Sequence, residues 1–216
     1  RQVKNGETWN DTDDDTVGTL SRYTHTTEYG SETGATATAG TGYEFVGWYK
    51  VETTGVAETA TTTGTTLSYT ATEDATYIAR FQKVKVTQTF TRQIEVDGIW
   101  TATTEDEIGT LTHYTHTDVV GATATSTATA GTGYEFVGWY DSTGNKVADT
   151  MLINDGATIS YTTTGNATYY ARFETAYTVN FVAQTKQADG SFKTDTVGGK
   201  VSVASVTAVD GTAASS

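Results

Sequence analysis

Fourteen consecutive residues of this chain occur twice without a single change. The block TATAGTGYEFVGWY fills positions 36–49 and again positions 127–140. An identical copy of this length identifies a tandem array, which is interpreted by its repeating unit before its individual residues. Tyr43 recurs 91 positions later as Tyr134, and this period exceeds the roughly 20–50 residues of solenoid and propeller units. We therefore expect each repeat to be a small domain with its own thin core.

The alignment of the copies sets the expected domain boundaries. Repeat 1 covers residues 1–83 without most of its first strand, repeat 2 covers 84–175, and a partial repeat 3 covers 176–216. Repeat 2 opens with VKVTQTFT at 84–91, and repeat 3 opens similarly with YTVNFVAQ at 177–184. The joints between repeats contain no Gly/Ser-rich or Pro-rich linker, which predicts a semi-rigid rod.

Side-chain alternation predicts β-strands throughout the chain. In ATYYARF, residues 167–173, small and aromatic residues alternate with polar ones at the period of two that strands require. Within Tyr43–Tyr49 the same alternation places Phe45 on one face and Trp48 on the other, which predicts a central strand covered on both sides. Glycine-containing turns separate the runs, and no segment of ten or more residues has a helical period. The predicted fold class is all-β.

Composition restricts the partners of the chain. Its formal net charge is −13, which argues against nucleic acid and anionic membranes, because both require a basic face. The chain contains no cysteine, so disulfides cannot staple the repeats. No stretch reaches the roughly 18 apolar residues of a membrane span, so we expect no membrane insertion of this segment. About a quarter of the residues are threonine, which suits solvated strands; O-glycosylation and threonine-based covalent crosslinks are the minority alternatives.

Two blocks carry a resemblance to a known family. They are GYEFVGWY at Gly42–Tyr49 and Gly133–Tyr140, and the closing strands at Ala75–Phe81 and Ala167–Phe173. With these blocks the chain resembles the bacterial internalin-type B-repeat family, and more closely its divergent branch, which occurs in tandem on cell-surface proteins. The resemblance implies small β-rich domains with a β-grasp-like fold, a role as spacers or adhesive segments, and no catalytic residues.

The candidate chemical sites are weak. His25 and His116 are repeat equivalents, but a zinc site needs several converging ligands, so we interpret them, with His113, as structural or surface residues. The acidic runs Asp11–Asp15 and Glu105–Glu107 do not have the spacing of a calcium loop. We interpret these runs as solvated loops, with a weak calcium site as the alternative. We therefore predict no enzyme activity, no catalytic or cofactor-binding residues and no metal site.

Glutamines that recur at one position allow one kind of covalent crosslink to be considered. Gln2, Gln93 and Gln184 occupy the same position in the three repeats, where a Thr–Gln ester is conceivable. Lysines do not recur in this way, because Lys4 aligns with Glu95, and this argues against a repeated isopeptide bond. The ester is the minority interpretation of the glutamines.

The tryptophans can serve either the core or a ligand. We place Trp48 and Trp139 in the core, because aromatic residues supply most of the buried mass of a thin domain. An exposed aromatic on a β surface would instead stack on sugar rings. Trp9 and Trp100 have polar surroundings and leave both interpretations open.

Two functional hypotheses follow. The first is a structural spacer or stalk segment of a bacterial surface or extracellular fibre protein, whose partners are neighbouring repeats of the same polypeptide. The second is an adhesive module that binds host glycan or protein through exposed aromatics and through loops such as 50–64 and 141–156, which differ most between the repeats. The ends also leave two interpretations open. Either the segment comes from a longer array, or its ends complement those of other copies in a filament.

Overall fold

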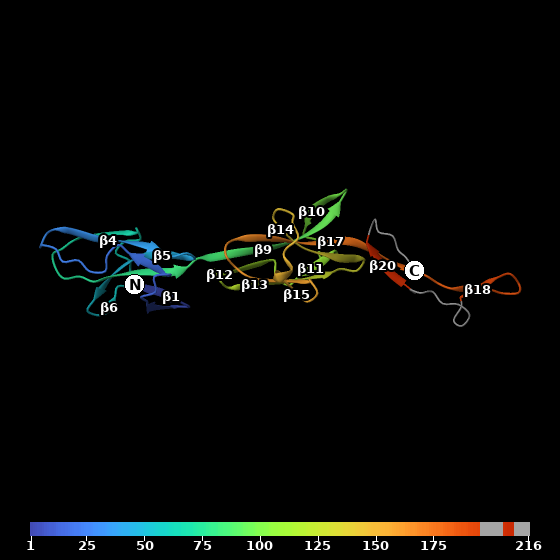
Figure 1. The fold of residues 1–216 in the computed structure, drawn as a ribbon, viewed down its shortest axis with the longest axis horizontal. Coiled ribbons are helices and arrows are strands. Elements are labelled where there is room, and N and C mark those ends of the chain that lie inside the picture. Colours follow the sequence, from blue (N-terminus) through green and yellow to red (C-terminus); the bar gives the residue numbers. More distant parts are fainter. Residues whose placement is uncertain (195–204, 210–216) are drawn as a thin grey trace. The chain divides into compact units, whose positions relative to one another are not determined.

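The structure is a computed structural model that describes residues 1–194 and 205–209. The chain divides into two compact units, Arg1–Val86 with Asp118–Gly121, and Thr87–Thr117 with Ala122–Ser216. We call them unit 1 and unit 2. Figure 1 shows strands along the whole described chain, with one 3-10 turn, Asp149–Met151, as the only helical element there. The predicted all-β class is confirmed, and the parts of repeat 3 at 195–204 and 210–216 lie outside the described residues.

Unit 1 consists of two sheets. The larger has the strand order β2-β1-β8-β5-β6 and the smaller the order β3-β4-β7. Strand β1 runs parallel to β8, whereas the other pairs are antiparallel. The strands are β1 Gln2–Asn5, β2 Thr8–Asp11, β3 Gly18–Leu20, β4 Glu32–Ala39, β5 Tyr43–Glu52, β6 Gly55–Val56, β7 Thr66–Thr70 and β8 Tyr77–Lys83.

Unit 2 repeats this plan with a longer first strand. Its sheets have the orders β10-β9-β17-β14 and β11-β13-β16-β15, and β12 adds to β9 while β20 adds to β17. A hairpin of β18 and β19 follows. The strands are β9 Lys85–Val96, β10 Ile99–Thr103, β11 Gly109–Leu111, β12 Thr115–Val119, β13 Thr123–Ala130, β14 Tyr134–Asp141, β15 Leu152–Ile153, β16 Thr158–Thr162, β17 Ala167–Asn180, β18 Gln184–Lys186, β19 Phe192–Thr194 and β20 Ser205–Val209. Over the described ranges, no helix has the length and apolar character that crossing a bilayer requires.

The repeated tryptophan lies at the centre of each core. Trp48 is 2% exposed and Trp139 is fully buried, as predicted. Each indole N–H donates to a backbone carbonyl at 3.0 Å, that of Thr65 or of Ala157. The indole therefore fills the core without leaving its one polar atom unpaired. The phenylalanines of the closing strands, Phe81 and Phe173, are fully buried, and those of the repeated block, Phe45 and Phe136, are half-buried.

A β-bulge corrects the predicted faces of the repeated block. The pairing of β5 with β8 shifts register between Phe45 and Gly47, and β14 shifts equivalently. The extra residue of a bulge restores a side chain to the face that strict alternation denies it. Phe45 and Trp48 consequently lie in one core, with ring centroids 5.9 Å apart. The prediction that they lie on opposite faces was wrong.

A close approach explains the glycine that opens β3 and β11. A Cβ atom on Gly18 would lie 2.6 Å from the ring of Phe81, and one on Gly109 would lie 2.5 Å from the ring of Phe173. Any side chain there would push the buried phenylalanine out of its position. These glycines let the smaller sheet of each unit pack closely on the closing strand.

Candidate functional site

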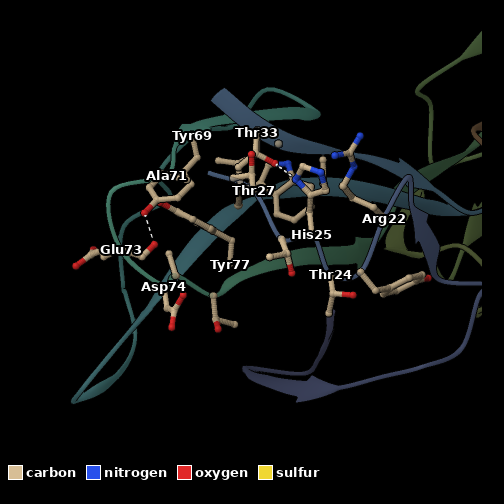
Figure 2. Close-up of a pocket in the computed structure, with 18 of the residues that line it drawn as sticks. Arg22, Thr24, His25, Thr27, Thr33, Tyr69, Ala71, Glu73, Asp74 and Tyr77 are labelled. Atoms are coloured by element: carbon tan, nitrogen blue, oxygen red, sulfur yellow. Dashed lines mark hydrogen bonds between the residues drawn. The ribbon is translucent and has the colours of Figure 1, made fainter. Parts of the chain in front are cut away.

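A groove of about 640 Å³ opens into unit 1 beside its core. One wall is the irregular segment 22–29, and the other walls come from β4, β7 and the approach to β8 (Figure 2). Its apolar lining includes Leu20, Trp48, Leu67, Tyr69 and Tyr77. Grooves of this size and character are typical sites of ligand or peptide binding.

In unit 2 a phenylalanine of the first strand fills the corresponding place. Phe90 on β9 is 1% exposed and meets the ring of Trp139 edge-on, with centroids 5.8 Å apart. It also stacks on Tyr169 at 6.2 Å. Trp139 and Tyr169 are the equivalents of Trp48 and Tyr77, which line the groove of unit 1. The groove is thus the position that Phe90 occupies in the other repeat.

Backbone pairing shows the same difference. In unit 2, residues Gln88–Ile94 of β9 pair in parallel with Ala167–Phe173 of β17. In unit 1, β1 pairs with β8 only at Arg80 and Phe81. Among the described residues of unit 1, no strand continues this ladder along Tyr77–Ala79. The floor of the groove is therefore the edge of strand β8 along Tyr77–Ala79.

Segment 22–29 changes conformation accordingly. Its equivalent in unit 2 contains β12, which pairs with β9, and the amide of Phe90 donates to the carbonyl of Tyr114 at 2.8 Å. In unit 1 the segment forms no strand. His25 lies within hydrogen-bond distance of Thr33, with 2.6 Å between Nδ1 and Oγ1 (Figure 2). His25 thus lies in the wall of the groove. His116 lies in the equivalent segment of unit 2, where Phe90 fills the corresponding place.

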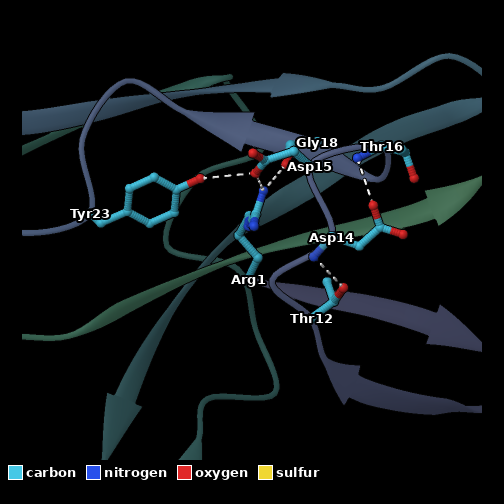
Figure 3. A network of polar contacts seen from close by, with 7 residues as sticks. All are labelled: Arg1, Thr12, Asp14, Asp15, Thr16, Gly18 and Tyr23. Carbon is cyan, nitrogen blue, oxygen red and sulfur yellow. Dashed lines mark hydrogen bonds and ion pairs between the residues drawn. The ribbon is translucent and has the colours of Figure 1, made fainter.

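An arginine clamp explains part of the acidic runs. In unit 1 the Arg1 guanidinium contacts a carboxylate oxygen of Asp15 at 2.7 Å and donates to the carbonyl of Gly18 (Figure 3). In unit 2 the equivalent Arg92 contacts Asp106 at 2.6 Å and donates to the carbonyls of Thr104 and Gly109. The two carboxylates are largely exposed, at 73% and 78%, but both guanidiniums are buried. Asp15 and Asp106 therefore hold a loop against the sheet.

Asp14 in the first acidic run also has a local partner. Asp14 accepts a hydrogen bond from the amide of Thr16 at 2.9 Å, and this bond holds the pKa of Asp14 below its usual range (Figure 3). Among residues 1–194 and 205–209 no group of three or more His, Asp or Glu side chains could hold a metal ion. In the first acidic run, the Asp14 side chain is thus bonded to the backbone of its own loop.

A second arginine, which the sequence analysis missed, stacks between two aromatic rings in each unit. The guanidinium of Arg80 lies 4.8 Å from the ring of Trp9 and 4.2 Å from that of Tyr49. In unit 2, Arg172 lies 4.7 Å from Trp100 and 3.9 Å from Tyr140. Such cation–π contacts cover the outer face of the sheet with Trp9 and Trp100. The available signal was the arginine that recurs before the closing phenylalanine.

The recurring glutamines hold these arginines in place. The side-chain carbonyl of Gln2 accepts a hydrogen bond from Nε of Arg80 at 2.9 Å, and that of Gln93 accepts one from Nε of Arg172 at 3.0 Å. The glutamine thus orients the guanidinium between its two rings. This contact accounts for the recurrence of Gln2 and Gln93 without a covalent bond.

Comparison with known families gives one match in two copies. The family described as the divergent InlB B-repeat domain matches residues 11–85 and 99–177, which together are more than half of the chain. No curated protein matches the chain, and no solved structure does.

Proposed function

Because the chain belongs to the divergent InlB B-repeat family, we propose that it is a structural spacer or stalk segment of a bacterial surface or extracellular fibre or adhesin protein. The family accounts for the tandem repeats and suggests a surface location. The spacer role and the extracellular location of this particular chain are our proposal. In this role the partners of each repeat are its neighbours along the polypeptide, and no catalysis is required.

One observation carries this proposal. The aromatic and arginine residues that recur in both repeats make contacts that hold the fold together: Trp48 and Trp139 in the cores, Arg1 and Arg92 in the loop clamps, and the stacked Arg80 and Arg172. Repeats that keep the same core and stabilising contacts suit a segment whose role is to add length to a protein and to stay folded.

The experiment is surface display. The chain is placed between a wall anchor and a short epitope, in zero, one or two copies, on a bacterium with a thick surface layer. A spacer should increase antibody access to the epitope with copy number. The increase should persist when Tyr23 and Tyr29 are replaced by serine. Antibody access that does not depend on copy number would contradict the spacer role.

An adhesive module is the second candidate, and the tyrosines beside the groove favour it. Tyr23 is 63% exposed and Tyr29 is 84% exposed, both in segment 22–29. Exposed aromatic rings can stack on sugars or anchor protein partners. The burial of Trp48 and Trp139 removes the strongest candidates for a glycan platform. Adhesion of the displayed chain to host cells, lost on Tyr29→Ser and unaffected by Tyr177→Ser, would favour this function over the spacer.

A further inference from the structure

Four residues of repeat 2 belong structurally to unit 1. The segment Asp118–Gly121 covers the end of β12 and the turn that follows it, yet it groups with Arg1–Val86. We propose that the turn at 40–42, together with Val84, is a docking surface for this segment, so that a repeat is completed by a loop of the repeat that follows it. This inference goes beyond the spacer role, because it concerns what stabilises a repeat and not what the array carries.

Backbone hydrogen bonds link the parts of this contact. The amide of Val120 donates to the carbonyl of Val84 at 2.9 Å, and the amide of Val84 donates to the carbonyl of Gly42 at 3.0 Å. Val84 is the one residue between the end of β8 and the start of β9, so it is the point at which the chain leaves repeat 1. Both of its backbone polar groups are therefore paired, the amide with its own repeat and the carbonyl with the next.

The side chain of Val120 covers the turn at 40–42. Gly42 has a φ of +79°, which favours glycine, and a Cβ atom there would lie 3.3 Å from Cγ1 of Val120. A methyl group of the valine therefore lies directly over the α-carbon of the glycine. Val84 and Val120 are half-buried, and Val86 is buried. The contact thus removes apolar surface from water at the exit of the repeat.

The exit of repeat 2 shows the same backbone arrangement. The amide of Ala176, the equivalent of Val84, donates to the carbonyl of Gly133 at 2.8 Å, and the turn at 131–133 has the same Gly-Thr-Gly sequence. Val209, the last residue of β20, lies opposite Ala176 in an antiparallel pair. Strand β20 lies within repeat 3. A strand of the following repeat thus pairs with the exit residue in both places, although the two strands differ in sequence.

Repeat 1 supplies a matched position for comparison. Tyr29 aligns with Val120, and Gly30 aligns with Gly121. Both glycines have a left-handed backbone, with φ of +80° and +88°, so the loop has the same turn in the two repeats. The side chains differ in their surroundings, since Tyr29 is 84% exposed and Val120 is half-buried. Shortening Tyr29 therefore alters the same place in the loop without touching the docking surface.

Docking of this kind makes the stability of one repeat depend on the sequence of the next. In a tandem array the total stability is the sum of the stabilities of the single repeats and of the contacts between neighbouring repeats. The contact of Val120 with Gly42 and Val84 supplies such a contribution to unit 1. A substitution in repeat 2 at Val120 should therefore destabilise unit 1 more than unit 2.

The test is denaturant unfolding of the full chain, followed by NMR signals of each unit. Val120→Ala removes two methyl groups from the contact and should raise the unfolding equilibrium constant of unit 1 about fivefold. The control Tyr29→Ala should change it by less than about twofold, as is usual for an exposed position. An unchanged unit 1, a loss in unit 2 as large as that in unit 1, or an equal effect of Tyr29→Ala would each overturn the proposal.

Amide hydrogen exchange shows directly with which unit the segment opens. Trp48→Ala weakens unit 1, and it should accelerate exchange of the hydrogen-bonded amide of Ala37, in the core of that unit, at least about tenfold. The amide of Val120 should accelerate by the same factor, because its bond to Val84 depends on unit 1. The amide of Ala128, in the core of unit 2, should exchange as before. A Val120 amide that follows Ala128 and not Ala37 would overturn the docking of this segment on unit 1.

Discussion

Units 1 and 2 contain the same fourteen-residue block, yet the core of unit 2 is more completely covered than that of unit 1. Trp139 is enclosed by Phe90, whereas Trp48 borders an open groove. Leu111 is buried at 7% exposure, whereas its equivalent Leu20 is only half-buried. In unit 2 the additional cover comes from Phe90 on β9, the strand that precedes the repeated block in sequence. The folding unit of this array is therefore the repeated block together with the strand that precedes it.

The largest expected effect comes from removing the central indole of the complete unit. Trp139→Ala deletes a fully buried ring and its hydrogen bond to Ala157, and it should lower the free energy of unfolding of unit 2 by about 4–5 kcal/mol. Denaturant unfolding followed by NMR signals of each unit measures this. Trp48→Ala should cost less, because one side of Trp48 already lies next to the groove. Equal losses in the two units would contradict the comparison.

Removing the Phe90 side chain should give unit 2 an open space beside its tryptophan, as in unit 1. Phe90→Ala opens the space beside Trp139 and should cost about 3 kcal/mol. The matched control is Phe181→Ala, which aligns with the same position but lies outside the core of unit 2. In dilute solution the control should leave both units unchanged. Thermal unfolding by calorimetry distinguishes the variants. A Phe90→Ala protein as stable as the original would show that β9 contributes little to the core.

Removing the carboxylate that contacts the buried arginine should lower the free energy of unfolding by less, and by about the same amount in both units. Asp106→Ala leaves the buried guanidinium of Arg92 with two backbone carbonyls and the ring of Tyr114. It should cost about 1 kcal/mol, because the carboxylate is mostly exposed and its charge is screened. Asp15→Ala should have a similar effect on unit 1. Unfolding in urea at low and high salt measures both. No change in either unit would mean that the carbonyl contacts hold the loop without the carboxylate.

The smallest effect should be stabilising. Glu174 lies opposite Glu135, and partial burial, followed by the charges of Glu95 and Glu135, raises its pKa. A raised folded-state pKa adds stability at low pH that is lost as the pH rises through that pKa. Glu174→Gln should therefore stabilise unit 2 by about 0.5 kcal/mol at neutral pH. The gain should vanish below about pH 4, where the carboxyl is protonated in both states. Unfolding curves at both pH values measure this difference.

Unit 1 supplies the control for this charge effect. Its equivalent of Glu174 is Gln82, whose side-chain amide donates to Glu44 at 2.6 Å. Gln82→Glu should destabilise unit 1 at neutral pH by a similar amount, since it places two carboxylates opposite each other. If both substitutions shift stability in the same direction, like-charge repulsion is not the cause.

The sequence was sufficient to predict the central buried residues, but not the contacts around them. The repeated block, together with the need of a thin core for aromatic mass, predicted that Trp48 and Trp139 are buried. Alternation misplaced Phe45, because the bulge is set by pairing with β8, and Gly47 is its one local signal in the strand. The partners of Arg80 and Arg172 come from strands distant in sequence, so their stacking could not be read from spacing. The groove also escaped prediction, because it reflects how far a parallel ladder extends.

The most direct test compares the exchange rates of two indole protons. The N–H groups of Trp48 and Trp139 lie in identical sequence blocks, and each donates to a carbonyl at 3.0 Å. They differ chiefly in the presence of Phe90. Hydrogen exchange measured by NMR in dilute solution should be about a hundredfold slower for Trp139, a difference of about 2.7 kcal/mol, and Phe90→Ala should remove that difference. Equal exchange rates in the unaltered chain, or slower exchange at Trp48, would contradict the claim that the preceding strand completes the core.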